Sequence, residues 1–326
     1  MKLSPDKARR LTRVARLYYE ENRHQQEIAA LLGVSRPLIS RMLGEAREAG
    51  IVQIRIVPPA EFENPLLGKA KAAFGLQGGL LVPARPERGN GGSLNQALGL
   101  AALDYLANPD GAKGTTEQGG LGGGRIGLGW GHIIGVLVRI MEKRPPAPGG
   151  FTGVCPMVGN SGASIRNYHS NENVRIVAHQ AMAEAHFLHT PAFAETAQEL
   201  SLWRQTENYK SVQKEWDRLD IALVNIGNHP STPDFASHAR YGNLLSERQA
   251  VGRLIAYYFN LKGEIIHSDT DYAIQIPLPS LARSRHVVGI CSAEVLPQAI
   301  LGALRTGILT HLVAGEEQLR QAMELP

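Results

Sequence analysis

The stretch HQQEIAALLGVSRPLISRMLGEAREAGIVQIRIV, residues 24–57, decides how the beginning of this chain is interpreted. Its first part places apolar residues at helical spacing and ends at Gly33, which can adopt the left-handed conformation that a sharp turn requires. A second helix is expected after Ser35, which suits an N-cap, with Pro37 in its first turn. Two short helices joined at a glycine, the second with an arginine-rich face, predict a DNA-reading helix-turn-helix. The alternative is an ordinary helical hairpin with a solvated basic face.

The candidate DNA contacts lie on the second helix and at the start of the first. Arg36, Ser40 and Arg41 fall within the first two turns of the second helix, the part that enters the major groove in such motifs. Arginine can bind guanine with two hydrogen bonds, whereas contacts to phosphates are expected from the preceding helix, with Arg47 or Arg55. Each single arginine could instead be a solvated charge. The complete predicted set is Gln25, Gln26, Ser35, Arg36, Pro37, Ser40, Arg41 and Arg47.

The charge of the chain is unevenly distributed along its 326 residues. Residues 1–57 contain eleven Lys and Arg against six Asp and Glu, which gives this segment a net charge of +5. The remaining residues carry 23 basic and 24 acidic groups, a net charge of −1. The positive charge is therefore confined to the segment with the helix-turn-helix, as expected of a DNA-binding domain joined to a neutral domain.

The composition argues against membrane and disulfide-rich classes of protein. No apolar run approaches the roughly 20 residues that span a bilayer, and the N-terminal residues lack the apolar core of a signal peptide. Only Cys155 and Cys291 are present, and both are expected to be buried small hydrophobic residues. A cytoplasmic protein without contact to a membrane is the expectation.

Several familiar site motifs are absent or misplaced, so we expect no cofactor and no metal. Gly122, Gly124 and Gly127 spell G-x-G-x-x-G, but they precede a strand, whereas a dinucleotide fingerprint follows one. His186 and His189 lie in an expected strand without further ligands at metal spacing. There is no phosphate-binding G-K-[ST] motif and no serine in a G-x-S-x-G elbow.

The chain divides at the prolines that follow the opening segment. A first helix is predicted over residues 6–22, and it should pack on the two later helices. The alternating residues 51–57 predict a strand, either the wing of a winged helix or a lead-in to the next domain. Pro58 and Pro59 break regular structure. We therefore predict a DNA-binding domain at 1–57, a linker at 58–64 and an α/β domain at 65–326.

The α/β domain is predicted from apolar strands that alternate with helices. This pattern favours a mostly parallel sheet covered on both faces, with antiparallel strands near Lys262-Gly263 and Asp269–Asp271. Strands are expected at 78–84, 125–130, 153–159, 186–190, 221–227, 286–292 and 308–315, and helices at 65–74, 95–106, 132–143, 172–185, 193–217, 295–306 and 316–324.

Small and polar residues follow several of these strands directly. Ligands of open α/β sheets gather at the C-terminal ends of the strands, and backbone N–H groups at a helix N-terminus suit an anion or a sugar hydroxyl. The alternative is a set of tight strand-to-helix turns without a ligand. The candidate ligand-binding residues are Gly129, Trp130, Gly131, His132, Gly159, Asn160, Ser161, Gly227, Asn228, Ser292 and Glu294.

Nearly the whole chain resembles the SorC family of bacterial sugar-responsive transcriptional regulators. The resemblance rests on ARLYYEENRHQQEIAALLGVSRPLISRMLGEAREAGIVQIRI in the first segment, and on weaker landmarks later: IGLGWG (126–131), CPMVGNSG (155–162), NENVRIVAHQAMAEA (171–185), HTPAF (189–193), ALVNIG (222–227) and AILGALRTGILTHLVAGEEQLRQAM (299–323). It implies a Rossmann-like effector domain related in fold to sugar-phosphate isomerases and CoA transferases. It also implies a homodimer or homotetramer that binds double-stranded operator DNA and changes its operator affinity when a phosphorylated sugar or similar metabolite binds.

The chain departs from this family at the expected anion site. His132 and Ile133 stand where members commonly have Arg or Lys followed by Thr, and Leu296 stands where a lysine is usual. Ser292 and Ala293 replace the usual glycines. Each lost charge-assisted hydrogen bond removes about 1.5–3 kcal/mol from the binding of a phosphate. These departures argue against a phosphorylated ligand and leave a neutral polyol or an altered sugar open.

We therefore predict a transcriptional regulator, not an enzyme, controlled by a carbohydrate-type effector: a sugar, a sugar phosphate or a polyol. A sugar-phosphate isomerase-like enzyme with a DNA-binding domain is the alternative, and it needs a placed carboxylate or lysine to move a proton. Glu172, Asp234 and Glu294 are the candidates, and none has a partner at convincing spacing. A third hypothesis makes the α/β domain solely an oligomerisation module.

Overall fold

The computed structural model describes residues 4–52, 64–83, 94–106, 123–146, 150–162, 169–231 and 237–326. The chain divides into two compact units, Met1–Pro58 and Pro59–Pro326, which we call the head and the body. Within the described part, no helix is long and apolar enough to cross a membrane. Of the predicted linker 58–64, only Asn64 is among the described residues, and its side chain caps the first helix of the body.

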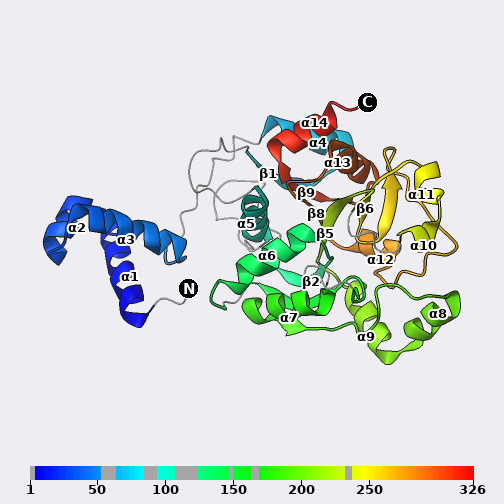
Figure 1. Cartoon of the computed structure of the whole chain (residues 1–326), viewed down its shortest axis with the longest axis horizontal. Coiled ribbons are helices and arrows are strands. Elements are labelled where there is room, and N and C mark those ends of the chain that lie inside the picture. Colours follow the sequence, from blue (N-terminus) through cyan, green and yellow to red (C-terminus); the bar gives the residue numbers. More distant parts are fainter. Residues whose placement is uncertain are drawn as a thin grey trace. The chain divides into compact units, whose positions relative to one another are not determined.

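The head consists of three helices around a small apolar core (Figure 1). These are α1 (Pro5–Tyr19), α2 (Gln25–Leu32) and α3 (Arg36–Glu48). Gly33 ends α2 in the left-handed conformation, with φ of 65° and ψ of 33°, which confirms the predicted sharp turn. The core is formed by apolar residues at helical spacing on all three helices: Val14, Leu17, Ile28, Ala29, Ile39 and Leu43.

The predicted strand at 51–57 is not found where its first residues are described. Ile51 and Val52 form a bend and pack against Leu11, Ala15 and Ala46, which belong to α1 and α3. Their backbone N–H groups both donate to the carbonyl of Ala46, at 2.9 and 3.1 Å. These bonds continue the end of α3 and take the place of a strand ladder. The remaining residues of the predicted strand, 53–57, lie outside the described part of the chain.

The body is built on a sheet whose described strands number nine, seven of them in the order β1-β9-β8-β5-β2-β3-β4 with all neighbours parallel. β6 and β7 extend it as an antiparallel hairpin, with β6 paired to β5. The strands are β1 (Gly78–Val82), β2 (Gly124–Leu128), β3 (Phe151–Pro156), β4 (Glu184–Ala185), β5 (Ile221–Asn228), β6 (Ala250–Leu254), β7 (Tyr257–Asn260), β8 (His286–Cys291) and β9 (His311–Gly315).

Helices cover both faces of this sheet, as the buried apolar strands predicted (Figure 1). One face packs on α5 (Leu94–Leu106), α6 (His132–Glu142) and α7 (Ser170–Ala181). The other packs on α4 (Pro65–Phe74), α9 (Glu207–Trp216), α12 (Leu278–Arg283), α13 (Pro297–Arg305) and α14 (Glu316–Met323). The remaining body helices are α8 (Ala197–Gln205), α10 (Ser237–Tyr241) and α11 (Leu244–Glu247). Side chains of β5 alternate between the two apolar layers, as a strand buried on both faces must.

Two predicted elements of the body were wrong. The strand predicted at 186–190 is irregular, because the pairing with β3 ends at Ala185. The single helix predicted at 193–217 is two helices, α8 and α9, because Thr206 is extended and its hydroxyl caps Tyr209 N–H at 3.2 Å. The antiparallel pairing predicted near Lys262-Gly263 and Asp269–Asp271 is confirmed: Phe259 bridges Ile265 and Ala273 bridges Phe193, and β6 pairs with β7 through a turn at Ile255 and Ala256.

The connections of the sheet create a topological switch point between β2 and β5. β2 leads through α6 to β3 on one side, whereas β5 leads through β6, β7 and α12 to β8 on the other. α6 and α12 lie on opposite faces of the sheet. Since β2 and β5 are neighbours, the chain departs from their C-terminal ends in opposite directions. In open α/β sheets, this is the position at which ligands bind.

Candidate functional site

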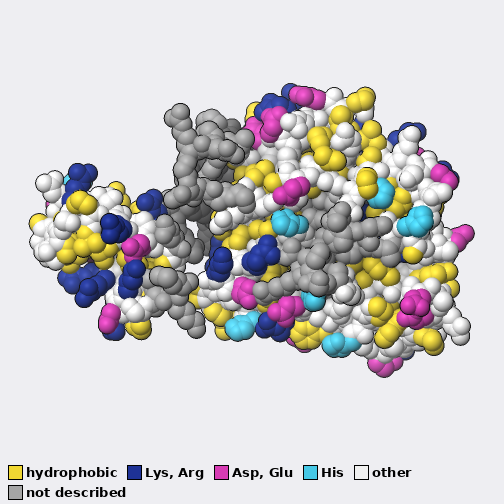
Figure 2. All heavy atoms as spheres, viewed as in Figure 1, with side chains coloured by type: hydrophobic (Ala, Val, Ile, Leu, Met, Phe, Trp, Pro, Cys, Tyr) yellow, Lys and Arg dark blue, Asp and Glu magenta, His cyan; other side chains and the backbone are white. Residues whose placement is uncertain are grey.

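The outer face of α3 carries the predicted DNA contacts. Ile39, Leu43 and Ala46 point into the head, so the opposite face of the helix is solvent-exposed. Arg36, Ser40 and Arg41 are exposed on it, and within residues 4–52 neither of these arginines forms an ion pair. Lys and Arg side chains are prominent on the head in the view of Figure 2. Two exposed guanidinium groups on a helix of 13 residues suit contact with an anionic groove.

The other predicted contacts of the head lie around this face. Ser35 has the extended backbone of an N-cap, with φ of −77° and ψ of 147°, but its side chain makes no capping hydrogen bond. Pro37 is exposed in the first turn of α3, Gln26 is exposed in the first turn of α2, and Gln25 is half-buried. Arg47 is exposed, and its Nε donates to the carbonyl of Leu43 at 3.4 Å. Arg55 lies outside the described residues.

In the body, Asn95 joins residues that follow two different strands. Its Nδ2 donates to Oε1 of Glu294 at 2.8 Å and lies 3.5 Å from Nε2 of His132. Its Oδ1 accepts the backbone N–H of Ala293 at 2.7 Å. Asn95 is buried in α5, whereas His132 and Glu294 are exposed. The buried amide therefore positions a solvent-facing imidazole and carboxylate beside each other.

The carboxylate of Glu294 is held in its charged form. Partial burial raises its pKa, but hydrogen bonds from Ser292 and Asn95 and the nearby His132 act more strongly together, so the net pKa is lowered. Ser292 itself is buried. An ionised carboxylate is an acceptor only, and it suits hydroxyl donors.

Asn228 fixes the end of β5 to the end of β8. Its Nδ2 donates to the carbonyl of Glu294, and its Oδ1 accepts the N–H of Leu296, both at 2.9 Å. The second bond lies at the start of α13, where Leu296 is the N-cap and is 52% exposed. Asn228 was predicted to bind a ligand, and in the structure its side chain joins the end of β5 to the segment that follows β8.

The glycines that follow β2 leave space for neighbouring segments of the same chain. Gly129 donates its N–H to the carbonyl of Leu223 at 2.9 Å, which continues the pairing of β2 with β5. Gly131 precedes α6 with φ of 125°, and a Cβ at this position would lie 2.7 Å from Nδ2 of Asn225. Gly131 therefore allows the amide of Asn225 to lie against the N-terminus of α6.

Two side chains at this edge were missed from the sequence, Asn225 in β5 and Arg253 in β6. Arg253 is directly opposite Gly227, and its Nε would be 3.1 Å from a Cβ placed on that glycine. Nδ2 of Asn225 would be 3.5 Å from the same Cβ. The available signal was a single polar residue within each of two otherwise apolar strands, IALVNIG and AVGRL. Without the antiparallel pairing of β5 and β6, the sequence could not bring the two together.

The residues that follow β3 form a separate group of contacts. Asn160 donates from Nδ2 to the carbonyl of Leu188 at 3.0 Å, and its Oδ1 accepts the N–H of Asn171 at 3.3 Å. A Cβ on Gly159 would lie 2.1 Å from the carbonyl oxygen of Pro191, so the backbone at Pro191 lies very close to the backbone at Gly159. Ser161 is half-buried. The described contacts connect this group to α7 and the 188–191 segment, and they do not join it to Asn95 and Glu294.

Trp130 belongs to the packing behind the strand ends, on the opposite face of the sheet from α6. Its side chain is 2% exposed, and its Nε1 donates to the carbonyl of Ile255 at 3.1 Å. Next to it, Arg240 donates to the carbonyl of Ala256 at 3.2 Å, and Gln275 accepts the N–H of Ala256 at 3.0 Å. These bonds hold the turn between β6 and β7 from three directions.

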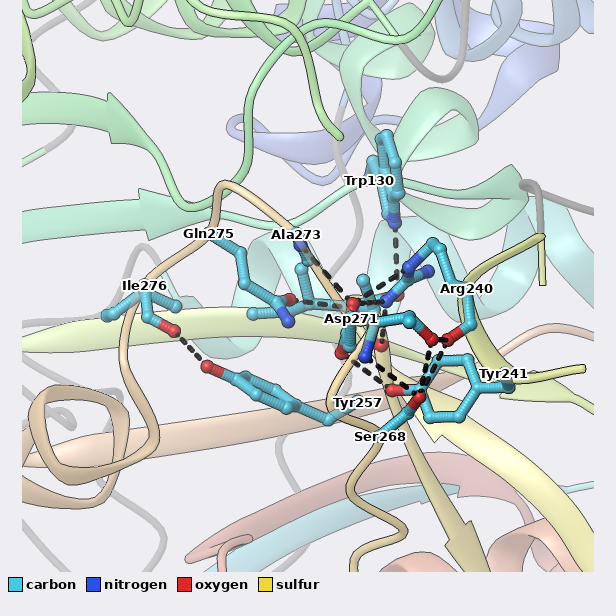
Figure 3. A network of polar contacts seen from close by, with 12 residues as sticks. Trp130, Arg240, Tyr241, Tyr257, Ser268, Asp271, Ala273, Gln275 and Ile276 are labelled. Atoms are coloured by element: carbon cyan, nitrogen blue, oxygen red, sulfur yellow. Dashed lines mark hydrogen bonds and ion pairs between the residues drawn. The ribbon is translucent and has the colours of Figure 1, made fainter. Parts of the chain in front are cut away.

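The same network contains a buried ion pair. Nε of Arg240 donates to Oδ1 of Asp271 at 2.8 Å, and the hydroxyl of Tyr241 donates to Oδ2 at 2.7 Å (Figure 3). The guanidinium of Arg240 lies 4.3 Å from the ring centroid of Phe193. Burial and the adjacent carboxylate of Asp271 raise the pKa of Tyr241, so its hydroxyl keeps its proton and remains a donor. The network therefore supports β6, the strand that carries Arg253.

The carboxylates considered for an enzyme do not form a catalytic group in the described residues. Glu172 makes two hydrogen bonds with Arg175, at 2.8 and 2.9 Å, on the surface of α7. Asp234 lies outside the described part. Among the residues that are described, no three His, Cys, Asp or Glu side chains are grouped as a metal site would require.

Known proteins with similar sequences cover almost the whole chain. Residues 114–324 match the protein family described as "Putative sugar-binding domain". The sorbitol operon regulator of Klebsiella pneumoniae is 29% identical over 322 residues, which cover 96% of each protein. The deoxyribonucleoside regulator of Bacillus subtilis (strain 168) is 24% identical over 317 residues, 95% of each.

Two solved structures are similar in fold to this chain. The full-length sorbitol operon regulator SorC of Klebsiella pneumoniae matches 98% of this chain and 100% of its own, with a TM-score of 0.70 and 28% identity. The structure described as "Probable sor Operon Regulator from Shigella flexneri" matches 79% of this chain and 98% of its own, with a TM-score of 0.63 and 25% identity. The likeness to the first of these extends over both head and body.

Proposed function

Because this chain belongs to the SorC family of sugar-binding transcriptional regulators, we propose that its head binds operator DNA through α3 and that its body binds the effector at the switch point between β2 and β5. The protein is a bacterial transcriptional regulator with a carbohydrate-type effector. The observation that carries the site assignment is the Asn95 junction, which places His132 and Glu294 side by side at that point.

The effector site contains two kinds of polar group. Glu294 offers a charged acceptor for hydroxyl donors, and His132 can donate or accept beside it. The N-terminus of α6 at Gly131 adds backbone N–H donors. We assign the residues that follow β3, including Asn160 and Ser161, to one wall of the site. This wall is next to the end of β2, because β3 is the neighbour of β2 in the sheet.

The regulatory mechanism follows from two sites on one chain. We propose a homodimer or homotetramer in the cytoplasm, in which two heads contact half-sites about 34–36 Å apart or a multiple of this spacing. The effector acts by favouring one arrangement of the subunits. Since coupling free energy is reciprocal, operator DNA must change the affinity for the effector by the same factor as the effector changes the affinity for DNA. Light scattering coupled to gel filtration measures the number of subunits.

Substitution of the α3 arginines tests the DNA-binding role. We expect Arg36→Ala and Arg41→Ala each to weaken binding to DNA from upstream of the protein's own gene by roughly 5- to 150-fold, equivalent to about 1–3 kcal/mol. Arg248→Ala, at an exposed arginine of the body, is the matched control and should leave binding unchanged. Fluorescence anisotropy at low salt gives the affinities. Equal affinities of all three variants and the parent would contradict the role of α3.

A thermal-shift screen of the full chain tests the effector site. Sugars, polyols and their phosphates are the probes, and a ligand at 100 times its Kd should add about 2.7 kcal/mol of stability. Glu294→Gln should weaken binding of the stabilising probe at least tenfold, whereas Glu247→Gln, at an exposed glutamate, should not. If no probe changes either the stability of the protein or its affinity for DNA, the proposed effector-binding role of the body is contradicted.

The body is proposed to be a receptor and not a catalyst. Glu294 is kept ionised by its hydrogen bonds, and the described contacts give it no lysine or second carboxylate with which to move a proton. Conversion of any probe, detected by mass spectrometry and lost in Glu294→Gln, would establish the enzymatic alternative.

A further inference from the structure

A groove lies on the surface of the head between α1 and α3. Its volume is about 810 Å³, and it is lined by residues of α1, of the end of α2 and of α3. Leu32, Val34 and Leu38 form part of its apolar lining, and Leu38 is 39% exposed. An ion pair between Lys7 and Glu45, at 2.9 Å, joins the two helices beside it. The groove is therefore open to a partner and is held in shape by contacts between α1 and α3.

Three exposed guanidinium groups line this groove: Arg10 and Arg13 from α1, and Arg41 from α3. In the part of the head that the structure describes, residues 4–52, none of the three forms an ion pair. Arg10 and Arg13 are three residues apart in a helix, so they lie side by side on its surface. The groove thus has cationic side chains on both of its long sides.

The acidic residues of α1 and α3 neutralise other positions. Asp6 pairs with Arg9 at 3.2 Å, and Glu20 pairs with Arg16 at 3.1 Å. Glu45 is held by its ion pair to α1. Asp6 and Glu45 are the acidic side chains among the described residues that line the groove, and both already have a cationic partner. The groove therefore keeps an excess of positive charge that no carboxylate of the described head offsets.

An apolar lining with cationic edges suits the backbone of duplex DNA. The duplex carries one negative charge per about 1.7 Å of its axis, and deoxyribose carbons alternate with the phosphates. Arginine can bind a phosphate through two parallel N–H···O bonds, and about half or more of the hydrogen bonds between proteins and DNA go to the backbone. A helix in the major groove has a phosphodiester strand on each side. With α3 in that position, one of the two strands lies on the side of α1.

We propose that α1 forms a second DNA-contacting edge of the head, at which Arg10 and Arg13 bind phosphates of the strand beside α3. This inference rests on the DNA-binding role proposed for α3 and adds a surface outside the helix-turn-helix. Contacts to phosphates increase the affinity for any duplex and carry no sequence preference. Arg41 lies where the two surfaces meet, because it belongs to α3 and also lines the groove.

Two double variants of the full chain test this proposal, and both remove two charges from the same helix. The groove variant is Arg10→Gln/Arg13→Gln. The matched control is Arg9→Gln/Arg16→Gln, which removes two exposed arginines that are ion-paired, at least one of them, Arg16, away from the groove. Fluorescence anisotropy gives the affinity for DNA from upstream of the protein's own gene and for a scrambled duplex of equal length, over a range of salt concentrations.

We expect the groove variant to bind both duplexes more weakly by the same factor, at least about tenfold near 0.1 M salt. The plot of log K against log salt should become shallower by about 1.8, since each phosphate contact contributes about 0.9. The ratio of the two affinities should stay unchanged, whereas Arg36→Ala and Arg41→Ala should lower it. The control should keep the slope of the parent. Arg10→Lys/Arg13→Lys, which retains both charges, should also keep that slope.

Two results would overturn the proposal and leave the role of α3 intact. One is an unchanged slope in the groove variant; if its number of subunits falls instead, as measured by light scattering, the groove binds a second copy of the chain. The other is an equal loss in the groove variant and the control, which would show a general effect of net charge. The role of α3 itself is contradicted if the parent does not prefer its own upstream DNA and Arg36→Ala leaves binding unchanged. Absence of binding by the parent to either duplex contradicts both.

Discussion

The ion pair between Arg240 and Asp271 allows a quantitative test of what supports the β6–β7 hairpin. Arg240 is 4% exposed, and Asp271 receives hydrogen bonds from it, from the hydroxyl of Tyr241 and from the N–H of Ala273. Asp271→Asn preserves the shape of the side chain but removes the negative charge. The positive charge of Arg240 would then remain buried without compensation. Removal of one partner of a buried pair costs about 3–5 kcal/mol.

The aromatic surroundings reduce this cost without cancelling it. The guanidinium of Arg240 lies 4.3 Å from the ring centroid of Phe193 and 5.2 Å from that of Tyr241. Such contacts stabilise a cation by about 0.5–2 kcal/mol each, so we place the loss at the lower end, about 3 kcal/mol. For a unit of this size, that corresponds to a fall of roughly 6–12 °C in Tm.

Calorimetric melting of the full chain, with the transition of the body followed separately, measures the effect. The matched control is Asp217→Asn, because Asp217 pairs with Arg283 at 3.0 Å while the two side chains are 46% and 64% exposed. An exposed pair contributes at most about 1 kcal/mol. The double variant Arg240→Met/Asp271→Asn should regain part of the loss, since no charge then remains buried. Equal destabilisation by Asp271→Asn and Asp217→Asn would refute the reasoning.

Two further predictions concern the far end of the sheet and the head. Burial, with the positive charges of His286 and Lys71 adding to it, lowers the pKa of His311 to about 4. The unfolded chain, with a histidine pKa of about 6.5, therefore takes up the proton first as the pH falls, and the free energy of unfolding should drop by about 2 kcal/mol between pH 7.5 and pH 5. Urea titrations of the parent and of His311→Gln measure this, and an equal drop in both would exclude His311 as the cause. In the head, Gly33→Ala should destabilise by about 1 kcal/mol because φ is 65°, whereas Gly44→Ala, inside α3 with nothing within 4 Å, should stabilise by about 0.5–1 kcal/mol. The two head variants differ in the sign of the change in Tm, and the same sign for both would contradict the backbone argument.

The sequence predicted those elements whose signal is local. The turn at Gly33, the N-cap at Ser35 and the apolar stripes of α1 to α3 depend on neighbouring residues, and the structure contains all of them. The buried parallel strands were equally visible, because a strand covered on both faces is apolar throughout. Where neighbouring residues compete, the prediction failed: the hydroxyl of Thr206 both accepts from Tyr209 N–H and donates to the carbonyl of Trp203, and so separates α8 from α9.

The candidate effector site was only partly predictable, because its geometry depends on pairing between distant segments. The rule for strand ends found His132 and Glu294, which lie four residues after the end of β2 and three residues after the end of β8. It did not find Asn95, which comes from the start of α5 and joins the two. It also missed Arg253, whose place is set by the register of β6 against β5. Trp130 illustrates the converse: its position after β2 was correct, yet its indole is buried against Ile255.

The pairing of β1 with β9 has a consequence for how the protein is made. β1 is the first strand of the body, and in the described sheet its backbone pairs with β9 alone, from Gly78 opposite His311 to Val82 opposite Gly315. The ribosome must therefore complete almost the entire chain before β1 has a partner, although the head can fold as soon as it emerges. Premature termination before β9 would release a head that we propose to bind DNA, followed by a β1 strand without a partner and a sheet in which the β8 edge is unpaired. Such edges promote aggregation, so truncated products that still recognise DNA should be removed from the soluble pool.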